Sequence, residues 1–431
     1  METCFTLAPP AGSDGPTLQW SGKRLLQTAA YCPARCIERY GGGEGADRLF
    51  LGDNHAVLRH LLRDYRGAVD LIYIDPPYNS GAAYTQTVRL RGDGPSGSAT
   101  VRRYDDAMPA DAYLQFLYER LLLARELLAD TGAVYVQLDA HRAPYVRVMM
   151  DEIFGSACFQ REIIWRIGWL SGYKTAVRNW VRNHDVILFY TKSSAFTFHK
   201  QYLPYDGGYV RRDGKRPRGK GHPIEDTWNC SPADRLDSIQ IKSFSGEKTG
   251  YPTQKNEALL ARIIEASSSP GDLVLDFFMG SGTAPVAAHR LGRRFIGADS
   301  SPGALRIAVS RLLRADPELR LEVLCTDDAK PAAGRARGRL TVENGRLAIA
   351  DFRPENLPRS LTAAAGDWRR TVDSVMIDYH SDGEVFAPTL LDVPEKNALV
   401  RGIYALPADA SRIRVRITDL FAECTEFEIR V

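Results

Sequence analysis

A carboxylate, two prolines and an aromatic ring follow one another at Asp75, Pro76, Pro77 and Tyr78. The apolar run before them, residues 69–75, predicts a buried strand, so these side chains lie at its carboxyl end, where open α/β sheets bind ligands. Proline fixes φ and has no N–H, so the strand cannot continue and its carbonyls stay free to accept hydrogen bonds. Asp75 and a proline carbonyl could therefore accept the hydrogens of an amino group, which would localise its lone pair on nitrogen for attack on an electrophilic methyl group.

The ring of Tyr78 offers a face on which a base taken out of a duplex can stack, and this replaces part of the stacking energy lost in the duplex. The alternative interpretation of the same tetrapeptide is an ordinary proline-rich exit from a strand. The rest of the sequence has to decide between the two.

A glycine corner stands about 200 residues later, in residues 272–283 (Asp-Leu-Val-Leu-Asp-Phe-Phe-Met-Gly-Ser-Gly-Thr). An apolar strand, a glycine turn and a helix start bring backbone N–H groups close to a ligand. Asp299 ends the next predicted strand, where an acidic side chain can accept both hydroxyls of a ribose. Taken alone, such a turn is also typical of ordinary strand-to-helix connections and of dinucleotide sites.

Strands and helices alternate around both segments, which predicts an α/β fold with a parallel sheet. No internal repeat is apparent. We expect strands over residues 69–75, 133–138, 273–276 and 294–298, and helices over residues 53–64, 110–129, 143–154, 256–266, 283–291 and 302–314.

Three parts of the chain lack this alternation. We expect an irregular lead-in over residues 1–48, which closes with a run of glycines, and a glycine-rich loop that ends near Asp106. Residues 161–250 mix aromatic side chains with arginines, glycines and prolines, and this composition predicts an inserted binding region.

The C-terminal part, residues 340–431, is predicted to be a β-rich module. Apolar residues alternate with charged ones at period two, which is typical of half-buried strands. The alternating residues are Ile413, Val415 and Ile417, then Phe427, Ile429 and Val431. Asp382 and Gly383 are candidates for a turn. Such a module could extend a binding surface, form a homodimer, dock a partner subunit or stabilise the core.

Composition favours a soluble globular protein of two or three units, because 44% of the 431 residues are hydrophobic and 25% are charged. We predict a cytoplasmic location, since no signal peptide and no run of eighteen apolar residues is present. The seven cysteines are scattered. Cys32 and Cys36 lack a second pair at zinc-ligand spacing, so we expect no metal site.

A formal net charge of +3 is too small to indicate a nucleic-acid partner by itself, but the basic residues are concentrated in the irregular region. They could hold phosphates or reach base edges, although a solvated loop is the alternative. The basic residues are Arg161, Arg166, Lys174, Arg178, Arg182, Arg211, Arg212, Lys215, Arg216, Arg218 and Lys220. Trp165, Trp169, Tyr173 and Trp180 could pack in a local core or wedge between bases.

Asp75-Pro-Pro-Tyr78 and Phe278-Met-Gly-Ser-Gly282 resemble the catalytic and cofactor motifs of amino-group DNA methyltransferases. Their order, catalytic motif first, is similar to that of the β class, which includes type III modification subunits and site-specific adenine-N6 methyltransferases. Further signatures of this family are resembled by Leu51-Gly-Asp-Asn54, Met150-Asp-Glu-Ile-Phe154 and Tyr251-Pro-Thr-Gln-Lys255, so the resemblance covers roughly residues 48–315.

The resemblance implies a Rossmann-like, doubly wound methyltransferase sheet with circularly permuted motifs, and S-adenosyl-L-methionine as the methyl donor. Asp276 and the turn from Phe278 would hold the methionine part of the donor, and Asp299 its ribose. The residues that the resemblance assigns to the cofactor pocket are Asp53, Asn54, Thr253, Lys255, Asp276, Phe278, Gly280, Gly282, Thr283 and Asp299. For Asp53 and Asn54, a helix N-cap is an equal alternative.

Three positions refine this comparison. Asn79 follows the tetrapeptide as it does in the type III-like branch. Tyr251 stands where the family usually has His, and Asn256 where it usually has Pro, so the fine contacts to the cofactor differ from the family pattern.

The resulting organisation is a lead-in (1–48), a catalytic half (49–160), a target-recognition region (161–250), a cofactor half (251–330) and a C-terminal β-rich domain (340–431). The predicted function is methylation of adenine N6 in double-stranded DNA, with a homodimer or a restriction subunit as candidate partners. The alternatives are cytosine-N4 methylation, RNA methylation and a non-catalytic DNA-binding specificity or scaffold subunit.

Overall fold

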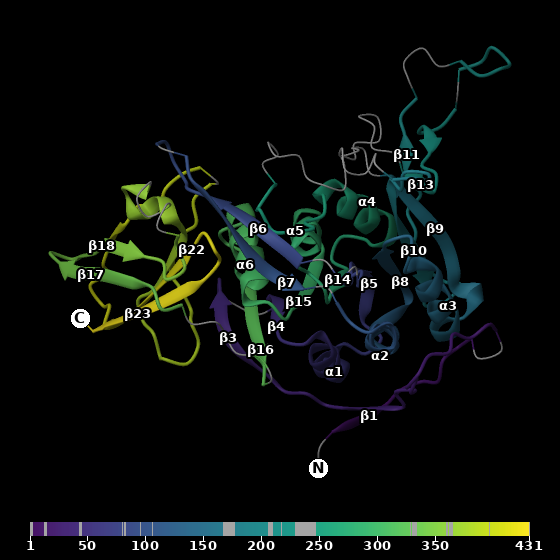
Figure 1. Cartoon of the computed structure of the whole chain (residues 1–431), viewed down its shortest axis with the longest axis horizontal. Helices are drawn as coiled ribbons and strands as arrows, with labels where there is room; N and C mark the ends of the chain where they lie inside the picture. Colours follow the sequence, from purple (N-terminus) through teal and green to yellow (C-terminus); the bar gives the residue numbers. More distant parts are fainter. Residues whose placement is uncertain are drawn as a thin grey trace.

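The computed structural model describes the chain apart from residues 1–2, 13–14, 43–44, 80, 82, 95, 106, 167–176, 206–209, 217, 229–246, 328, 330–333, 359–360, 362–364, 396 and 431, and apart from the side chains of residues 83–84 and 101–105. A sheet of ten strands forms the centre of the molecule (Figure 1). Its order is β13 (Thr227–Trp228), β9 (Phe159–Arg166), β10 (His184–Thr191), β8 (Leu128–Leu138), β5 (Val69–Ile74), β14 (Leu273–Asp276), β15 (Arg294–Asp299), β4 (Asp47–Leu51), β16 (Leu321–Thr326) and β3 (Ala34–Tyr40).

The middle of this sheet is parallel. Strands β8, β5, β14, β15, β4 and β16 run in one direction, while β10 pairs antiparallel with β8 and β3 pairs antiparallel with β16. The parallel centre confirms the α/β fold predicted from the alternation of strands and helices.

Helices cover both faces of the sheet. One face carries α1 (Asn54–Tyr65), α2 (Ala110–Leu127) and α3 (Ala143–Phe154), and the other carries α4 (Glu257–Ser267), α5 (Thr283–Arg290) and α6 (Pro302–Ala315). Side chains alternate between the two cores as the period of a strand requires. On β5, Ile72 and Ile74 enter the first core, whereas Leu71 and Tyr73 enter the second. The predicted doubly wound arrangement is therefore confirmed.

Capping residues in the sequence set where three of these helices begin. The Asp53 carboxylate accepts a hydrogen bond from His55 N (2.8 Å), Asn256 accepts from Ala258 N (2.7 Å) and Ser301 accepts from Ala304 N (3.3 Å). Such caps satisfy backbone donors that the first turn of a helix leaves unpaired. The helix starts predicted from the sequence lie within one residue of those observed.

The prediction of an irregular lead-in over residues 1–48 is wrong. Strands β1 (Cys4–Thr6) and β2 (Thr28–Ala30) pair with each other, and β3 forms the edge of the central sheet. Glu38 on β3 is buried between Arg306 of α6 and Arg416 of the C-terminal module. A buried acid with two distant arginines as partners gives no period-two signal, which is why the strand was not predicted.

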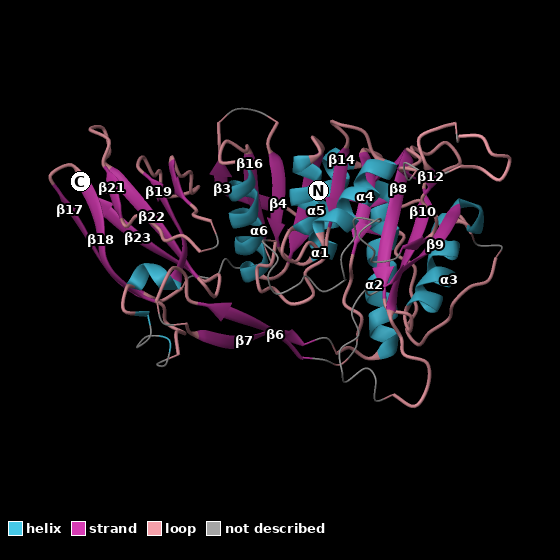
Figure 2. Ribbon diagram, turned by 90° about the horizontal axis from the view of Figure 1, so that it is seen from above, coloured by secondary structure: helices cyan, strands magenta, loops and turns pink. Residues whose placement is uncertain are grey.

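The glycine-rich loop predicted up to Asp106 is also wrong in part. Residues 83–105 contain a β-hairpin of β6 (Ala83–Arg89) and β7 (Ser98–Asp105), which we call the arm. Figure 2 shows that the arm runs from the core to the C-terminal module. Its sequence is rich in threonine and arginine and poor in large apolar residues, so it lacks the pattern of a core strand.

The prediction that residues 161–250 form an inserted binding region is wrong in part, because its first residues belong to two strands of the central sheet. Strands β9 and β10 pair with each other, and β10 pairs with β8, so both belong to the core rather than to an insertion. Beyond them lie the short pair β11 (Tyr202–Leu203) and β12 (His222–Pro223). The residues between 192 and 227 that the structure describes otherwise form turns and extended chain.

The C-terminal module is β-rich, as predicted. One sheet holds β17 (Arg337–Glu343), β18 (Arg346–Arg353) and β21 (Ile403–Ala405). The other holds β20 (Leu390–Asp392), β19 (Val372–Asp378), β22 (Arg412–Asp419) and β23 (Cys424–Arg430). Asp382 accepts hydrogen bonds from Glu384 N (2.8 Å) and Val385 N (3.2 Å), so the predicted turn exists, but it lies in a longer connection between β19 and β20.

Among the helices of the described residues, none is long and apolar enough to cross a lipid bilayer.

Candidate active site

The predicted catalytic tetrapeptide and the glycine corner meet in space. Strands β5 and β14 are parallel neighbours, with Leu71 opposite Val274, so their carboxyl ends lie at the same edge of the sheet. A cavity of about 390 Å³ at this edge is lined by both segments. This volume lies within the range of pockets that enclose a small molecule.

Most of the residues predicted for catalysis and cofactor binding line this one cavity. They are Asp53, Asn54, Asp75, Pro76, Pro77, Tyr78, Thr253, Lys255, Asp276, Phe278, Gly280, Thr283 and Asp299. Gly282, also predicted, is the N-cap of α5 and does not itself line the cavity.

Asp75 is held through both of its carboxylate oxygens. The Tyr78 hydroxyl donates to Asp75 Oδ1 at 2.8 Å, and the Lys255 ammonium pairs with Asp75 Oδ2. Lys255, predicted to line the cofactor pocket, therefore also contacts the carboxylate that is predicted to be catalytic. The pKa of the Tyr78 hydroxyl is raised well above its ordinary value by burial and by the nearby carboxylates, so this group remains a hydrogen-bond donor.

Asp185, at the start of β10, is a further carboxylate beside the tetrapeptide that sequence analysis did not single out. Its Oδ2 accepts from the Tyr78 hydroxyl at 3.2 Å and from Gln137 Nε2 at 3.1 Å. Gln137 in turn accepts from the Tyr73 hydroxyl at 2.6 Å. Burial raises the pKa of Asp185. A hydrogen-bonded chain thus runs across β5, β8 and β10 into the pocket.

Arg142 fixes the exit of the tetrapeptide. Its guanidinium donates to Tyr78 O (3.1 Å) and to Asn79 O (3.0 Å). The Asn79 side chain closes the base of the arm, since it donates to Met108 O (2.9 Å) and accepts from Met108 N (2.6 Å). Asn79 adopts a positive φ of 53°, a conformation that asparagine tolerates better than most residues.

Two carboxylates, Asp276, which is buried, and Asp299, which is half-buried, shape the glycine-corner end of the pocket. Asp276 accepts from Phe278 N (2.9 Å), and burial raises the pKa of Asp276 well above its ordinary value. Asp299 accepts from Gly280 N and Ser301 N, at 2.9 and 2.8 Å, and burial raises the pKa of Asp299 to about 6. These bonds fix the turn between strand β14 and helix α5.

Asp53 is the N-cap of α1 and Asn54 is its first residue, and both also line the cavity. Asn54 Nδ2 donates to Phe277 O at 2.9 Å, which ties α1 to the glycine corner. Arg120 of α2 bonds both Asp53 oxygens (3.0 and 2.9 Å) and Asn54 Oδ1, and it stacks on Phe116 at 3.6 Å. Arg120 was not predicted as a site residue.

The geometry fits an S-adenosyl-L-methionine type of donor. The half-buried Asp299 carboxylate stands at the end of β15, where a ribose can bind, and Gly280 and Gly282 have φ of 51° and 77°. Positive φ is accessible to glycine without strain and lets the backbone approach a ligand closely. Within the described residues, His, Cys, Asp and Glu side chains form no group of three that could hold a metal ion.

The residues predicted to contact DNA are dispersed and exposed. Ten of the eleven lie within the described chain, and Lys174 lies outside it. Arg182 is held by Asp139 at 2.9 Å, and Arg211 lies 3.6 Å from Asp213. Trp165 is fully buried in the core, whereas Trp180 is 97% exposed. Trp169 and Tyr173 lie outside the described residues.

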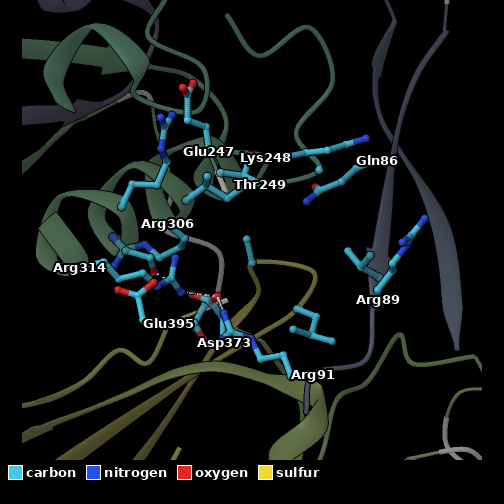
Figure 3. A pocket seen from close by; sticks show the side chains of 18 of the residues that line it. Gln86, Arg89, Arg91, Glu247, Lys248, Thr249, Arg306, Arg314, Asp373 and Glu395 are labelled. Atoms are coloured by element: carbon cyan, nitrogen blue, oxygen red, sulfur yellow. Dashed lines mark hydrogen bonds and ion pairs between the residues drawn. The ribbon is translucent and has the colours of Figure 1, made fainter. Parts of the chain in front are cut away.

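A second, larger cavity of about 1150 Å³ separates the arm from α6 and the C-terminal module (Figure 3). The tip of the arm crosses to the module, where Arg91 pairs with Asp373. Asp373 also accepts from two groups of α6, Arg314 at 2.6 Å and Ser310 at 2.9 Å. Asp373 therefore joins the arm, the core and the module.

Comparison with known proteins gives a consistent result. The family described as DNA methylase, which groups N6 and N4 methyltransferases, matches residues 69–310. Type II methyltransferase M.EcaI of Enterobacter cloacae is 27% identical over 60% of this chain and 68% of its own length. DNA adenine methyltransferase YhdJ of Escherichia coli is 26% identical over 63% of this chain and 84% of its own length.

The StyLTI Mod subunit of a type III restriction-modification enzyme, from Salmonella typhimurium, is 27% identical over 58% of this chain, and the match spans half of that subunit. Among solved structures, the M1.HpyAVI–SAM complex matches 62% of this chain and 99% of its own, with 21% identity and a TM-score of 0.38. The cytosine-N4-specific PvuII DNA methyltransferase matches 64% of this chain and 90% of its own, with 14% identity and a TM-score of 0.42.

Proposed function

The chain belongs to the DNA methylase family of N6 and N4 methyltransferases. We propose that it transfers a methyl group from S-adenosyl-L-methionine to the N6 amine of an adenine that is flipped out of double-stranded DNA. The observation that carries the proposal is the single cavity shared by Asp75 and the glycine corner. A donor held at the corner would present its methyl group to an amine held at the tetrapeptide.

In this proposal the residues of the pocket have three roles: binding the donor, binding the target amine and stacking the base. Asp276, Asp299 and the Gly280 turn hold the donor, which supplies a methyl group on a positively charged sulfur. Asp75 and a proline carbonyl accept hydrogen bonds from the target amine, so its lone pair is available to the methyl carbon. Tyr78 supplies the ring on which the extruded base stacks, which offsets part of the cost of unstacking, a few kcal/mol.

Adenine is favoured over cytosine by the carboxylate at position 75, which resembles the adenine branch of the family. The name of the relative YhdJ, a DNA adenine methyltransferase, agrees with this choice. Cytosine N4 is the second candidate, because its exocyclic amine offers the same hydrogens to the same acceptors.

The DNA duplex would lie across the exposed face of the region between residues 161 and 220. The predicted arginines and lysines that are described there are solvent-exposed and so can reach phosphates. The Trp180 side chain is exposed to solvent a few residues before Asp185 in the sequence, and it would fill the space that a flipped base leaves. We place the enzyme in the cytoplasm with DNA, and a restriction subunit or a second copy of the chain remains the candidate protein partner.

Mass spectrometry of nucleosides from DNA incubated with the protein and S-adenosyl-L-methionine tests the proposal. We expect N6-methyladenine from the wild-type protein and at least about a hundredfold slower transfer from Asp75→Ala, because the amine loses its charged acceptor. Calorimetry should show that Asp75→Ala still binds the donor. N4-methylcytosine alone would select the second candidate, and normal methylation by Asp75→Ala would refute the role of this carboxylate.

A further inference from the structure

The Tyr78 hydroxyl lies between two carboxylates. It is 2.8 Å from Asp75 Oδ1 and 3.2 Å from Asp185 Oδ2. A phenol has one hydrogen and can donate it fully to one acceptor at a time. In the structure the shorter and therefore stronger bond is the one to Asp75.

Each oxygen of Asp75 already has one donor. Its Oδ1 accepts from Tyr78 and its Oδ2 pairs with the Lys255 ammonium. A carboxylate oxygen can accept more than one hydrogen bond, but a target amine would have to share Oδ1 with Tyr78 unless that donor turns away. The bond from the uncharged tyrosine is the one more easily exchanged, because the bond from Lys255 is reinforced by the attraction between opposite charges.

Asp185 is built as a fixed second acceptor. It is the second residue of strand β10, it is 3% exposed, and it is oriented by Gln137, which is fully buried. Tyr78 and Gln137 both donate toward the same oxygen, so Oδ2 serves as an acceptor. Tyr78 can therefore turn its hydrogen toward Asp185 with little movement of its ring.

We propose that Asp185 is a positioning residue that takes over the hydrogen bond of the Tyr78 hydroxyl when the target amine binds Asp75. The exchange frees Asp75 Oδ1 for the amine and keeps the Tyr78 ring in the orientation on which the base stacks. The hydrogen stays bonded to the tyrosine oxygen throughout, so no proton is transferred. The inference rests on the proposed function, because it concerns the amine acceptor of that reaction.

The alternative is that Asp185 only stabilises the fold by satisfying its buried neighbours. The two roles differ in their dependence on Tyr78. A purely structural acid would have the same effect whether or not residue 78 carries a hydroxyl, whereas a positioning acid acts through that hydroxyl.

A double-mutant cycle in single-turnover methylation of DNA, with saturating S-adenosyl-L-methionine, separates these roles. Asp185→Leu removes the acceptor at similar volume, and Asp185→Ala removes it without added bulk. We expect each to slow methyl transfer by about ten- to a hundredfold with little change in the KM for DNA, since one hydrogen bond to a charged group is lost at the reacting centre. Asp185→Asn keeps an acceptor oxygen and should recover most of the rate.

In a Tyr78→Phe background the same Asp185 substitutions should change the rate by less than about twofold, because the hydroxyl is already gone. Thr191→Val is the matched control, since Thr191 is fully buried on the same strand but has no contact with Tyr78. It should leave the transfer rate per folded molecule unchanged. Melting curves for each variant give the folded fraction.

The outcomes separate this inference from the proposed function. A wild-type protein that binds S-adenosyl-L-methionine and methylates no DNA overturns both. An active wild-type protein whose Asp185→Leu and Asp185→Ala variants are equally active overturns the positioning role alone. The same holds if the penalty is as large with Phe as with Tyr at position 78.

Discussion

At the scale of single residues, buried carboxylates set the chemistry of the pocket. The pKa values of Asp185, Asp276 and Asp299 are all raised, and in each case burial is the largest cause. An ionisable group in a low-dielectric site favours its neutral form unless a partner of opposite charge or a hydrogen bond stabilises the charged form. The binding of a donor that needs ionised acceptors is therefore expected to depend on pH.

Affinity for S-adenosyl-L-methionine should fall as the pH falls through the pKa of Asp299, about 6. On the proposed function the ionised carboxylate would accept both ribose hydroxyls, whereas the protonated form would give up one acceptor position, so proton binding would compete with the donor. Between about pH 7.5 and about pH 5.5 the dissociation constant should rise by about fourfold. Isothermal titration calorimetry across this range measures the change.

Asp299→Asn is the control for this dependence. The amide does not titrate, so the variant should bind more weakly at every pH and lose the part of the dependence that Asp299 contributes. Any dependence that remains would come from Asp276, which lies nearby and also has a raised pKa. An unchanged profile in Asp299→Asn would show that this carboxylate is not the group that titrates.

The sequence predicted the residues that sit within contiguous motifs and missed those that reach the pocket from elsewhere. Asp75, Tyr78 and Asp299 each end or follow an apolar strand, and that position is visible in the sequence. Asp185 and Arg142 are separated from Tyr78 by 107 and 64 residues, and only the sheet brings them there. An aspartate at the start of the apolar run 186–190 was the one signal for Asp185.

At the scale of elements, the sequence predicted four strands of the parallel centre and the alternation of the C-terminal strands, but it missed the interior strands β4, β10 and β16 and the edge strand β3. β5 and β14 are apolar throughout and buried on both faces, which is typical of the centre of a parallel sheet. β3 carries arginines and a glutamate, and its partner β16 is far away in the sequence. The arm strands β6 and β7 pair with each other, but they carry threonines and arginines instead of a regular apolar pattern.

Gly282→Ala should damage the corner between β14 and α5. Gly282 has φ of 77°, and a Cβ there would lie 2.7 Å from Ala308 Cβ, so both the backbone and α6 would have to adjust. We expect a loss of stability of about 1–3 kcal/mol and weaker donor binding. Chemical denaturation and calorimetry measure the two effects.

Gly271→Ala is the matched control for that substitution. Gly271 also has a positive φ, 91°, but a Cβ there would meet nothing within 4 Å. Gly271→Ala should lower the free energy of unfolding by about 1 kcal/mol, the cost of a positive φ for a residue with a Cβ, and it should leave donor binding unchanged. Equal losses in the two variants would mean that the contact with α6 is unimportant.

At the scale of the whole molecule, the arm links the segment of Asp75–Tyr78 to the C-terminal module. It starts just after Tyr78, and its tip is fixed by Arg91, which is 6% exposed and donates to Asp373 and to the carbonyls of Glu395 and Ala398. Burial alone would raise the pKa of Asp373, but Arg314 and Arg91 hold it below its ordinary value. The joint between arm, core and module is therefore a cluster of one acid, Asp373, and two bases, Arg91 and Arg314.

Asp373→Ala should destabilise the attachment of the module by about 3 kcal/mol, because it leaves two partly buried arginines without their shared partner. Limited proteolysis should then cut the arm or the module faster, and the denaturation midpoint should fall. Asp351→Ala removes an acid from the same module at an exposed pair with Arg353 and should change stability little. Equal behaviour of the two variants would contradict the role of the joint.

The meeting of Arg91 and Asp373 also limits how related sequences can diverge. The two residues are 282 positions apart, yet the loss of Asp373 alone leaves both Arg91 and Arg314 without their shared partner in a poorly hydrated place. A neutral residue at position 373 is therefore best tolerated where position 91 is neutral too. Across natural relatives that keep both the arm and the module, these two positions should therefore co-vary, although nothing in their local sequence connects them.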